Sequence, residues 1–224
     1  MKQLLLNNRF GISDMPCIFI GNRFLSIEND ASPGHCLELV IGITGASGAI
    51  YAKRLLEMLE GRKGMNVHLV VSEMAKTILK DELDISIHAL ARSAKRLYSN
   101  KDMGAPISSG SVRFDALVII PASMSTLSKV ACGISDNLIT RLGAVALKER
   151  RRFILVPRET PLSAIHLENM HRLSIAGAVI MPACPGFYNG PKDIQDLADN
   201  LCFRVLDLLG IDNEAAPRYP KKHR

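Results

Sequence analysis

Three glycines and two hydroxyl side chains lie close together where an apolar run ends and an amphipathic stretch begins. The glycines are Gly42, Gly45 and Gly48, and the hydroxyl groups belong to Thr44 and Ser47. A phosphate meets backbone N–H groups only where no Cβ stands in the way, and a following helix points its positive end at the turn. The stretch therefore predicts an anion-binding turn, to which Thr44 and Ser47 add hydroxyl donors.

The spacing of these glycines differs from the dinucleotide-binding fingerprint. GITGASG is not G-x-G-x-x-G, and Tyr51 occupies the last glycine position of the T-G-x-x-G-x-x-G form found in some dehydrogenases. A short-chain dehydrogenase would also need Y-x-x-x-K on one helix. Tyr188 and Lys192 have that spacing, but Gly190 and Pro191 break the helical turn that would align them.

Basic residues form a second candidate group. Arg141 and Lys148 are seven residues apart, which places them on one face of a predicted helix, two turns apart. Lys148 also begins a run that continues through 150–152, and such runs are often only solvated. An acidic small-molecule substrate suits this charge, whereas the aromatic residues that would accompany nucleic-acid binding are missing, so we expect no nucleic-acid partner.

Short apolar runs alternate with amphipathic segments along most of the chain. Buried strands are predicted over 39–43, 66–72, 116–120, 153–156 and 178–181, and helices over 49–59, 73–83, 87–97, 127–132, 136–150, 163–174 and 192–209. This alternation predicts an α/β fold with a doubly wound, mostly parallel sheet of Rossmann-like or flavodoxin-like type. Polar residues follow the strands that end at Ile43, Val71, Ile120 and Val156. Ligands bind at the carboxyl edge of such a sheet, so we expect these loops to converge on one crevice.

The composition is that of one soluble domain. The chain has 224 residues, 47% of them hydrophobic, a net charge of +6 and no apolar run of membrane length, so we expect no membrane contact. Residues 1–36 show neither clear periodicity nor a signal-peptide pattern, which predicts a poorly ordered or loosely packed extension before a domain over 37–224. The five cysteines lack C-x-x-C spacing, which argues against a disulfide framework or a zinc site and favours the cytoplasm.

Several segments, taken in order, resemble the flavin prenyltransferases of the UbiX family. They are GITGASGAIYAKRLL, VVSEMA, ISSGS, PASMSTLSKVACGISDNLITR, VALKERR, LVPRETPLSAIHLENM and MPACPGFYNGP, and the resemblance covers about residues 38–219. It implies a homododecamer with flavin between subunits and no metal requirement. The implied reaction joins the dimethylallyl group of dimethylallyl phosphate to reduced FMN and makes the prenylated FMN that UbiD-type decarboxylases use.

The resemblance also implies site residues. It places FMN on Gly45, Ala46, Ser47, Ser72, Ser123, Met124, Ser125, Thr126 and Arg158, and dimethylallyl phosphate on Arg141, Lys148, Tyr188 and Arg204. The residues matched to catalysis are Ser47, Glu82, Lys148 and Glu159. Ser125 stands where many members have Lys, and the chain has no Trp, which some members place near the flavin.

The reaction needs positive charge and donors aimed at the departing phosphate, which Arg141, Lys148, Arg204 and the Tyr188 hydroxyl supply. Glu159 either moves protons or only holds Arg158 or Lys148. By its residue type alone, Glu82 is more typical of a structural role. Two further interpretations stay open. An FMN-dependent cysteine decarboxylase would need a P-x-M-N-x-x-M-W segment, which is absent from the sequence. A non-catalytic flavin-binding protein would not need the basic residues.

Overall fold

The computed structural model describes residues 36–216. Its strands form one six-stranded sheet in the order β3-β2-β1-β4-β5-β6, and every pairing is parallel. The strands are β1 (Leu37–Ile43), β2 (Met65–Val71), β3 (Arg96–Ser99), β4 (Ala116–Ala122), β5 (Arg152–Pro157) and β6 (Val179–Ile180). The strand order reverses between β1 and β4, as in the Rossmann arrangement, which confirms the predicted doubly wound α/β fold.

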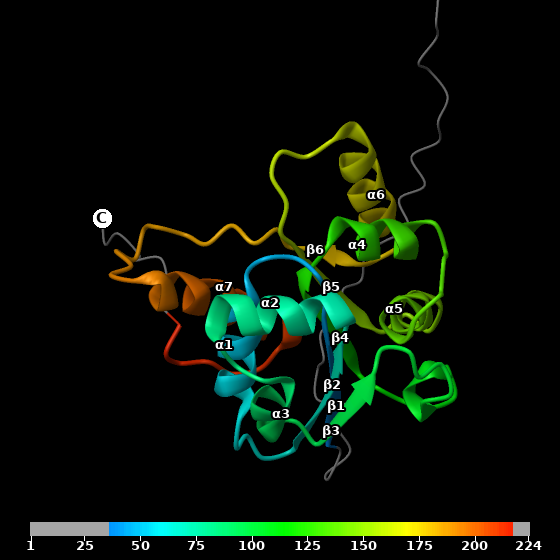
Figure 1. The fold of residues 1–224 in the computed structure, drawn as a ribbon, viewed down its shortest axis with the longest axis horizontal. Helices are drawn as coiled ribbons and strands as arrows, with labels where there is room; N and C mark the ends of the chain where they lie inside the picture. Colours follow the sequence, from blue (N-terminus) through cyan, green and yellow to red (C-terminus); the bar gives the residue numbers. More distant parts are fainter. Residues whose placement is uncertain (1–35, 217–224) are drawn as a thin grey trace, which may run out of the picture. The chain divides into compact units, whose positions relative to one another are not determined.

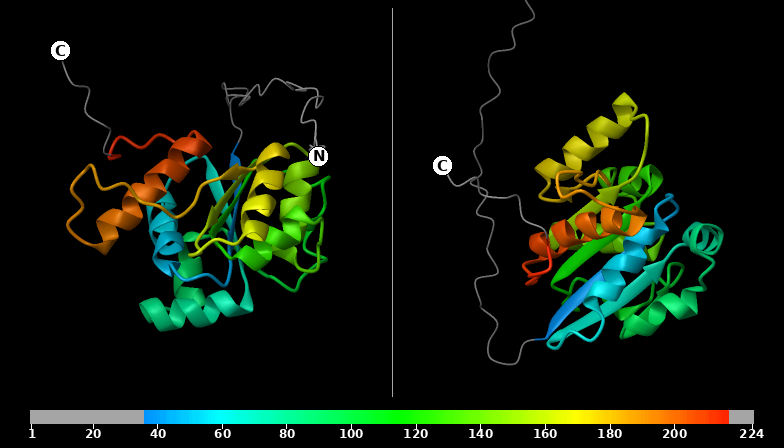
Figure 2. Two further views of the ribbon diagram at one scale, coloured as in Figure 1. Left: turned by 90° about the horizontal axis from the view of Figure 1, so that it is seen from above. Right: turned by 90° about the vertical axis from the view of Figure 1, so that its left-hand side faces the viewer.

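Helices cover both faces of the sheet (Figures 1 and 2). On one face lie α1 (Ala49–Leu59), α2 (Glu73–Leu83) and α7 (Ile194–Leu209), and on the other lie α4 (Met124–Ala131), α5 (Leu138–Lys148) and α6 (Ala164–Ile175). The short elements are α3 (Ile87–Leu90), η1 (Ala91–Ser93) and η2 (Pro106–Ser108). Within residues 36–216, no helix has the length and apolarity needed to cross a bilayer.

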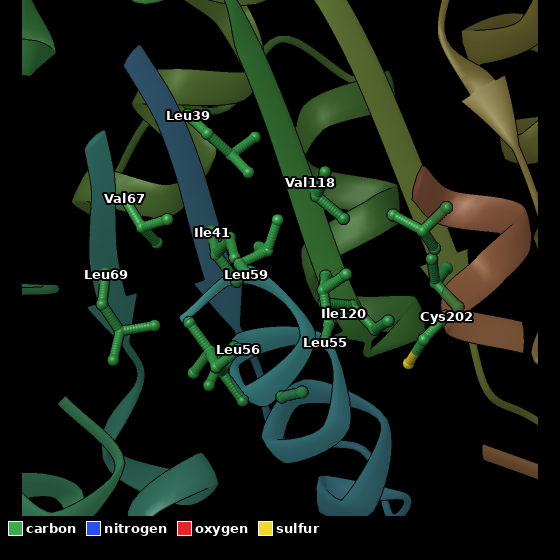
Figure 3. Close-up of a cluster of buried hydrophobic side chains, with 14 of the residues drawn as sticks. Leu39, Ile41, Leu55, Leu56, Leu59, Val67, Leu69, Val118, Ile120 and Cys202 are labelled. Carbon is green, nitrogen blue, oxygen red and sulfur yellow. The ribbon is translucent and has the colours of Figure 1, made fainter. Parts of the chain in front are cut away.

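Successive side chains of each strand point to opposite faces of the sheet, so the domain has two separate hydrophobic cores. In β1, Leu39 and Ile41 face α1 and α7, whereas Val40, between them, faces the opposite layer. Figure 3 shows the first core, where Leu55 and Leu59 of α1 meet side chains from β1, β2 and β4. The sheet is therefore buried on both faces, and its loops at the carboxyl edge are left to carry the chemistry.

Two sequence expectations need correction. The helix predicted over 87–97 ends early, because residues 96–99 form the edge strand β3, in which only Tyr98 is buried. The helix predicted from Leu127 begins at Met124 instead, so Ser123 is its N-cap residue. The predicted extension up to residue 35 lies outside the described residues.

Candidate active site

The glycine turn after β1 ends at the N-terminus of α1, and a carboxylate lies there. Gly48 has φ 106°, a left-handed conformation that favours glycine. The N–H groups of Gly48 and Ala49 donate to Oε2 of Glu82, on α2, at 3.0 and 2.9 Å. The turn does bind an anion, but these two N–H groups bind a side chain of the same chain. The expectation that they face a ligand phosphate therefore needs correction.

Glu82 belongs to a small charged network. Partial burial alone would raise the pKa of its carboxyl. The hydrogen bonds from Ser47 and from the two backbone N–H groups, together with the charge of Arg158, outweigh burial and lower the pKa below its ordinary value. Arg158, which follows β5, also donates from Nε to the Ser47 carbonyl oxygen at 2.9 Å. Ser47, Glu82 and Arg158 are thus brought together in the structure.

The N-terminus of α4 is a second helix end beside the glycine turn. Ser123 Oγ accepts a hydrogen bond from Thr126 N–H at 3.3 Å and lies 3.0 Å from its hydroxyl. Met124 is buried in the same turn, and Ser125 is exposed. An eight-residue helix points its positive end here, beside two hydroxyl side chains.

Thr44 connects this helix to the glycine turn. Its side chain is 2% exposed, its hydroxyl donates to the Pro121 carbonyl oxygen at 2.8 Å and accepts from Ser123 N–H at 2.7 Å. The Thr44 hydroxyl therefore links two loops by hydrogen bonds, and it is not the ligand donor that its residue type suggested. Among the residues assigned to FMN, Gly45 and Ala46 form the turn, and Ser72 caps α2 by accepting from Ala75 N–H at 3.2 Å.

The basic residues of α5 contact a different part of the chain. Arg141 Nε donates to the Ser108 carbonyl oxygen at 3.0 Å, and Lys148 pairs with Glu149 beside Gly110. Lys148 is the last residue of α5 and lies shortly before the start of β5, at Arg152. Arg158 comes directly after the end of β5, at Pro157. Lys148 and Arg158 of one chain therefore lie toward opposite edges of the sheet.

The remaining candidates lie on the exposed surface. Arg204, on α7, pairs with Asp207 at 2.8 Å, and Tyr188 lies in the segment between β6 and α7. Glu159 Oε1 accepts from Thr160 N–H at 3.1 Å, and within the described residues no ion pair joins Glu159 to Arg158 or Lys148. The predicted carboxylate–cation contact is therefore not present in a single chain.

Tyr51 lies beside the glycine turn, and the sequence analysis used it only as a mismatch to a glycine motif. A Cβ on Gly48 would lie 2.9 Å from its ring. Burial raises the pKa of its phenol, and so do the thiols of Cys202 and Cys184. The charge of Arg158 lowers this pKa, but the net effect is a raised pKa. Its position in the first turn of α1 is the signal that could have identified it.

The fold and the site together define a doubly wound α/β protein whose carboxyl edge gathers anion-binding helix ends, hydroxyl groups and an arginine. The sequence matches the profile of the Flavoprotein family over residues 28–204. The chain therefore belongs to this family and, within it, to the flavin prenyltransferases of the UbiX type. The flavin prenyltransferase UbiX of Methanocaldococcus jannaschii is 50% identical over 183 residues, which are 82% of this chain and 98% of the relative.

Solved structures agree with that placement. The dodecameric FMN-dependent UbiX-like decarboxylase from Escherichia coli O157:H7 matches with a TM-score of 0.81 and 41% identity, over 83% of this chain and 100% of that chain. AnUbiX (PadA1), solved in complex with FMN and dimethylallyl pyrophosphate, matches with a TM-score of 0.80 and 41% identity, over 84% and 100%.

Proposed function

We propose that this chain is a flavin prenyltransferase that transfers the dimethylallyl group of dimethylallyl phosphate to reduced FMN. The observation that carries the proposal is the Ser47–Glu82–Arg158 network beside the helix end at Ser123. It is supported by the names of the relatives and by a structural neighbour that holds FMN and a dimethylallyl donor. The product, prenylated FMN, would serve a UbiD-type decarboxylase.

The chemistry of the donor set fits FMN. The Glu82 charge at the start of α1 would repel a phosphate, so the flavin phosphate belongs at the start of α4, with the hydroxyls of Ser72, Ser125 and Thr126 and the guanidinium of Arg158 around it. Gly45, Ala46 and Met124 line the same loops and would contact the flavin through backbone and apolar groups. When bound, reduced FMN supplies the nucleophilic atoms that accept the dimethylallyl group.

The carboxylates of the site handle protons in this proposal. Glu82 is held ionised by hydrogen bonds from Ser47 and two backbone N–H groups, so in this proposal it orients the Ser47 hydroxyl for proton transfer. Glu159 is exposed at the same edge and is the proton acceptor. Neither role requires a rearrangement of α2 or of the loop that follows β5.

The departing phosphate needs cations, and in a single chain one of the proposed cations, Lys148, lies toward the opposite edge of the sheet from Arg158. Arg141 and Lys148 are held against residues 108–110, and Tyr188 and Arg204 lie beyond β6 and on α7. We therefore propose a homo-oligomer, a dodecamer like that of the Escherichia coli UbiX-like protein, in which neighbouring subunits complete each site. The four described cysteines are free thiols, which supports our proposal of a cytoplasmic location.

The deciding experiment is an anaerobic incubation of the protein with reduced FMN and dimethylallyl phosphate, followed by mass and absorbance measurement of the flavin. A flavin heavier by one dimethylallyl group is the expected result. Bound FMN of unchanged mass would instead indicate a flavin-binding protein without this activity.

A further inference from the structure

The segment between β6 and α7 presents Tyr188 on an exposed surface. Its ends are tied to the rest of the domain: Ala183 N–H donates to the Pro157 carbonyl oxygen at 2.9 Å, and Lys192 N–H donates to Asp196 Oδ2 at 2.8 Å. Tyr188 itself is 53% exposed. A side chain this exposed needs a local contact to fix the direction of its ring.

Gly186 makes that contact between the two ends. Its N–H donates to Oδ1 of Asn200, on α7, at 2.8 Å. A Cβ on Gly186 would lie 2.9 Å from Cε1 of Tyr188 and 3.3 Å from Oδ1 of Asn200. The tyrosine ring therefore packs where a side chain would otherwise be, and the Gly186 backbone lies between the ring and the amide.

Asn200 is an unusual choice for its position. It is 6% exposed, although the other buried side chains of α7 are apolar, as Leu201 and Cys202 are. A buried amide is costly unless it is hydrogen-bonded, and an apolar side chain of similar volume would pack here without that cost. The bond to Gly186 is what the amide contributes.

We propose that Asn200 is a positioning residue for the allyl phosphate, acting through Gly186 on the ring of Tyr188. This role rests on the proposed function, which assigns Tyr188 to the substrate. Asn200 and Arg204 are four residues apart, so they neighbour each other along α7. Helix α7 thus carries both Arg204, the cation for the phosphate, and Asn200, whose hydrogen bond to Gly186 orients the tyrosine.

The test compares Asn200→Leu with Asn169→Leu, the change of another buried asparagine (6% exposed), on α6, whose Nδ2 donates to Ser128 Oγ instead. For Asn200→Leu we expect KM for dimethylallyl phosphate to rise about five- to thirtyfold, as for the loss of one buried hydrogen bond, with FMN affinity and kcat within about twofold. Asn169→Leu should leave KM unchanged. In a Tyr188→Ala background, Asn200→Leu should raise KM no further, because the two residues act as one unit.

Unchanged KM in a folded, FMN-binding Asn200→Leu protein would overturn the proposal, as would full additivity with Tyr188→Ala. If Asn200→Leu does not fold, Gly186→Ala perturbs the same contact from the other side, and an unchanged KM there is equally decisive. Wild-type protein that makes no prenylated flavin would refute the proposed function and this role together. Wild-type turnover with an unaffected variant would refute the positioning role alone.

Discussion

Replacing Glu82 with Gln tests the network that closes the start of α1. The wild-type carboxylate accepts hydrogen bonds from Gly48 and Ala49 N–H groups and from Ser47. Gln keeps one oxygen acceptor but loses the charge that complements the helix end. We therefore expect the Gln variant to be folded and less stable than the wild type.

The size of the effect follows from the contacts. A negative charge at a helix N-terminus contributes about 0.3–1 kcal/mol at an exposed site, and losing a capping side chain altogether costs about 0.5–2 kcal/mol. The free energy of unfolding should fall by about 0.5–1 kcal/mol in Glu82→Gln and by about 1–2 kcal/mol in Glu82→Ala. Glu60, at the other end of α1, is the matched control, because removing a negative charge there is neutral or slightly stabilising.

Urea denaturation at a fixed protein concentration, repeated over a series of pH values, provides the measurement. The pKa of Glu82 is lower in the folded state than its ordinary value of 4.5, so its stabilising contribution is complete above that value and is lost as pH falls through the folded-state pKa. The stability gap between wild type and Glu82→Gln should therefore narrow at acid pH. Equal stability near neutral pH, or a gap that persists undiminished in acid, would refute this account of the site.

Other predictions concern binding and turnover. Lys148→Ala should retain FMN yet form the prenylated product about thirty- to a thousandfold more slowly in single-turnover experiments, since removing one charge-assisted donor costs about 2–4 kcal/mol. A wild-type rate in that variant would make Lys148 only part of a solvated run. Arg158→Ala should loosen FMN itself, which calorimetry measures directly. The same calorimetry should show FMN binding and weak NADPH binding, and the reverse order would contradict a flavin site. A chain beginning near Leu37 should still bind FMN and turn over, and loss of flavin binding in a folded truncated protein would show that residues 1–36 are needed.

The strands that carry the site could be predicted because each is a short apolar run buried on both faces. The edge strand β3 could not, because it buries only Tyr98 and follows a stretch whose apolar spacing suits a helix. The start of α4 was predicted three residues late, since Met124 and Ser125 read as loop residues until Ser123 is seen to cap them. That error conceals the helix end on which the proposed phosphate site depends.

The anion-binding character of the glycine turn could be predicted from its residues, but its occupant could not. Glu82 is 34 positions away from Gly48 in the sequence and reaches it only because α2 packs beside α1. Nothing local in either segment indicates that pairing. The residue-by-residue resemblance implied that Glu82 is functional. In the structure its carboxylate takes the position that the turn would otherwise offer to a phosphate.

Topology, more than spacing, decides which predicted residues share one site. Arg141 and Lys148 have the spacing of a common helical face, yet α5 begins beside Asn100, just past the carboxyl end of β3, and runs back toward the opposite edge. The chain then crosses the sheet along the six residues of β5, about 20 Å, before it reaches Arg158. A lysine side chain does not span that distance. This separation supports the proposal that Lys148 of one subunit and Arg158 of another serve the same site, in which case assembly is a condition of catalysis.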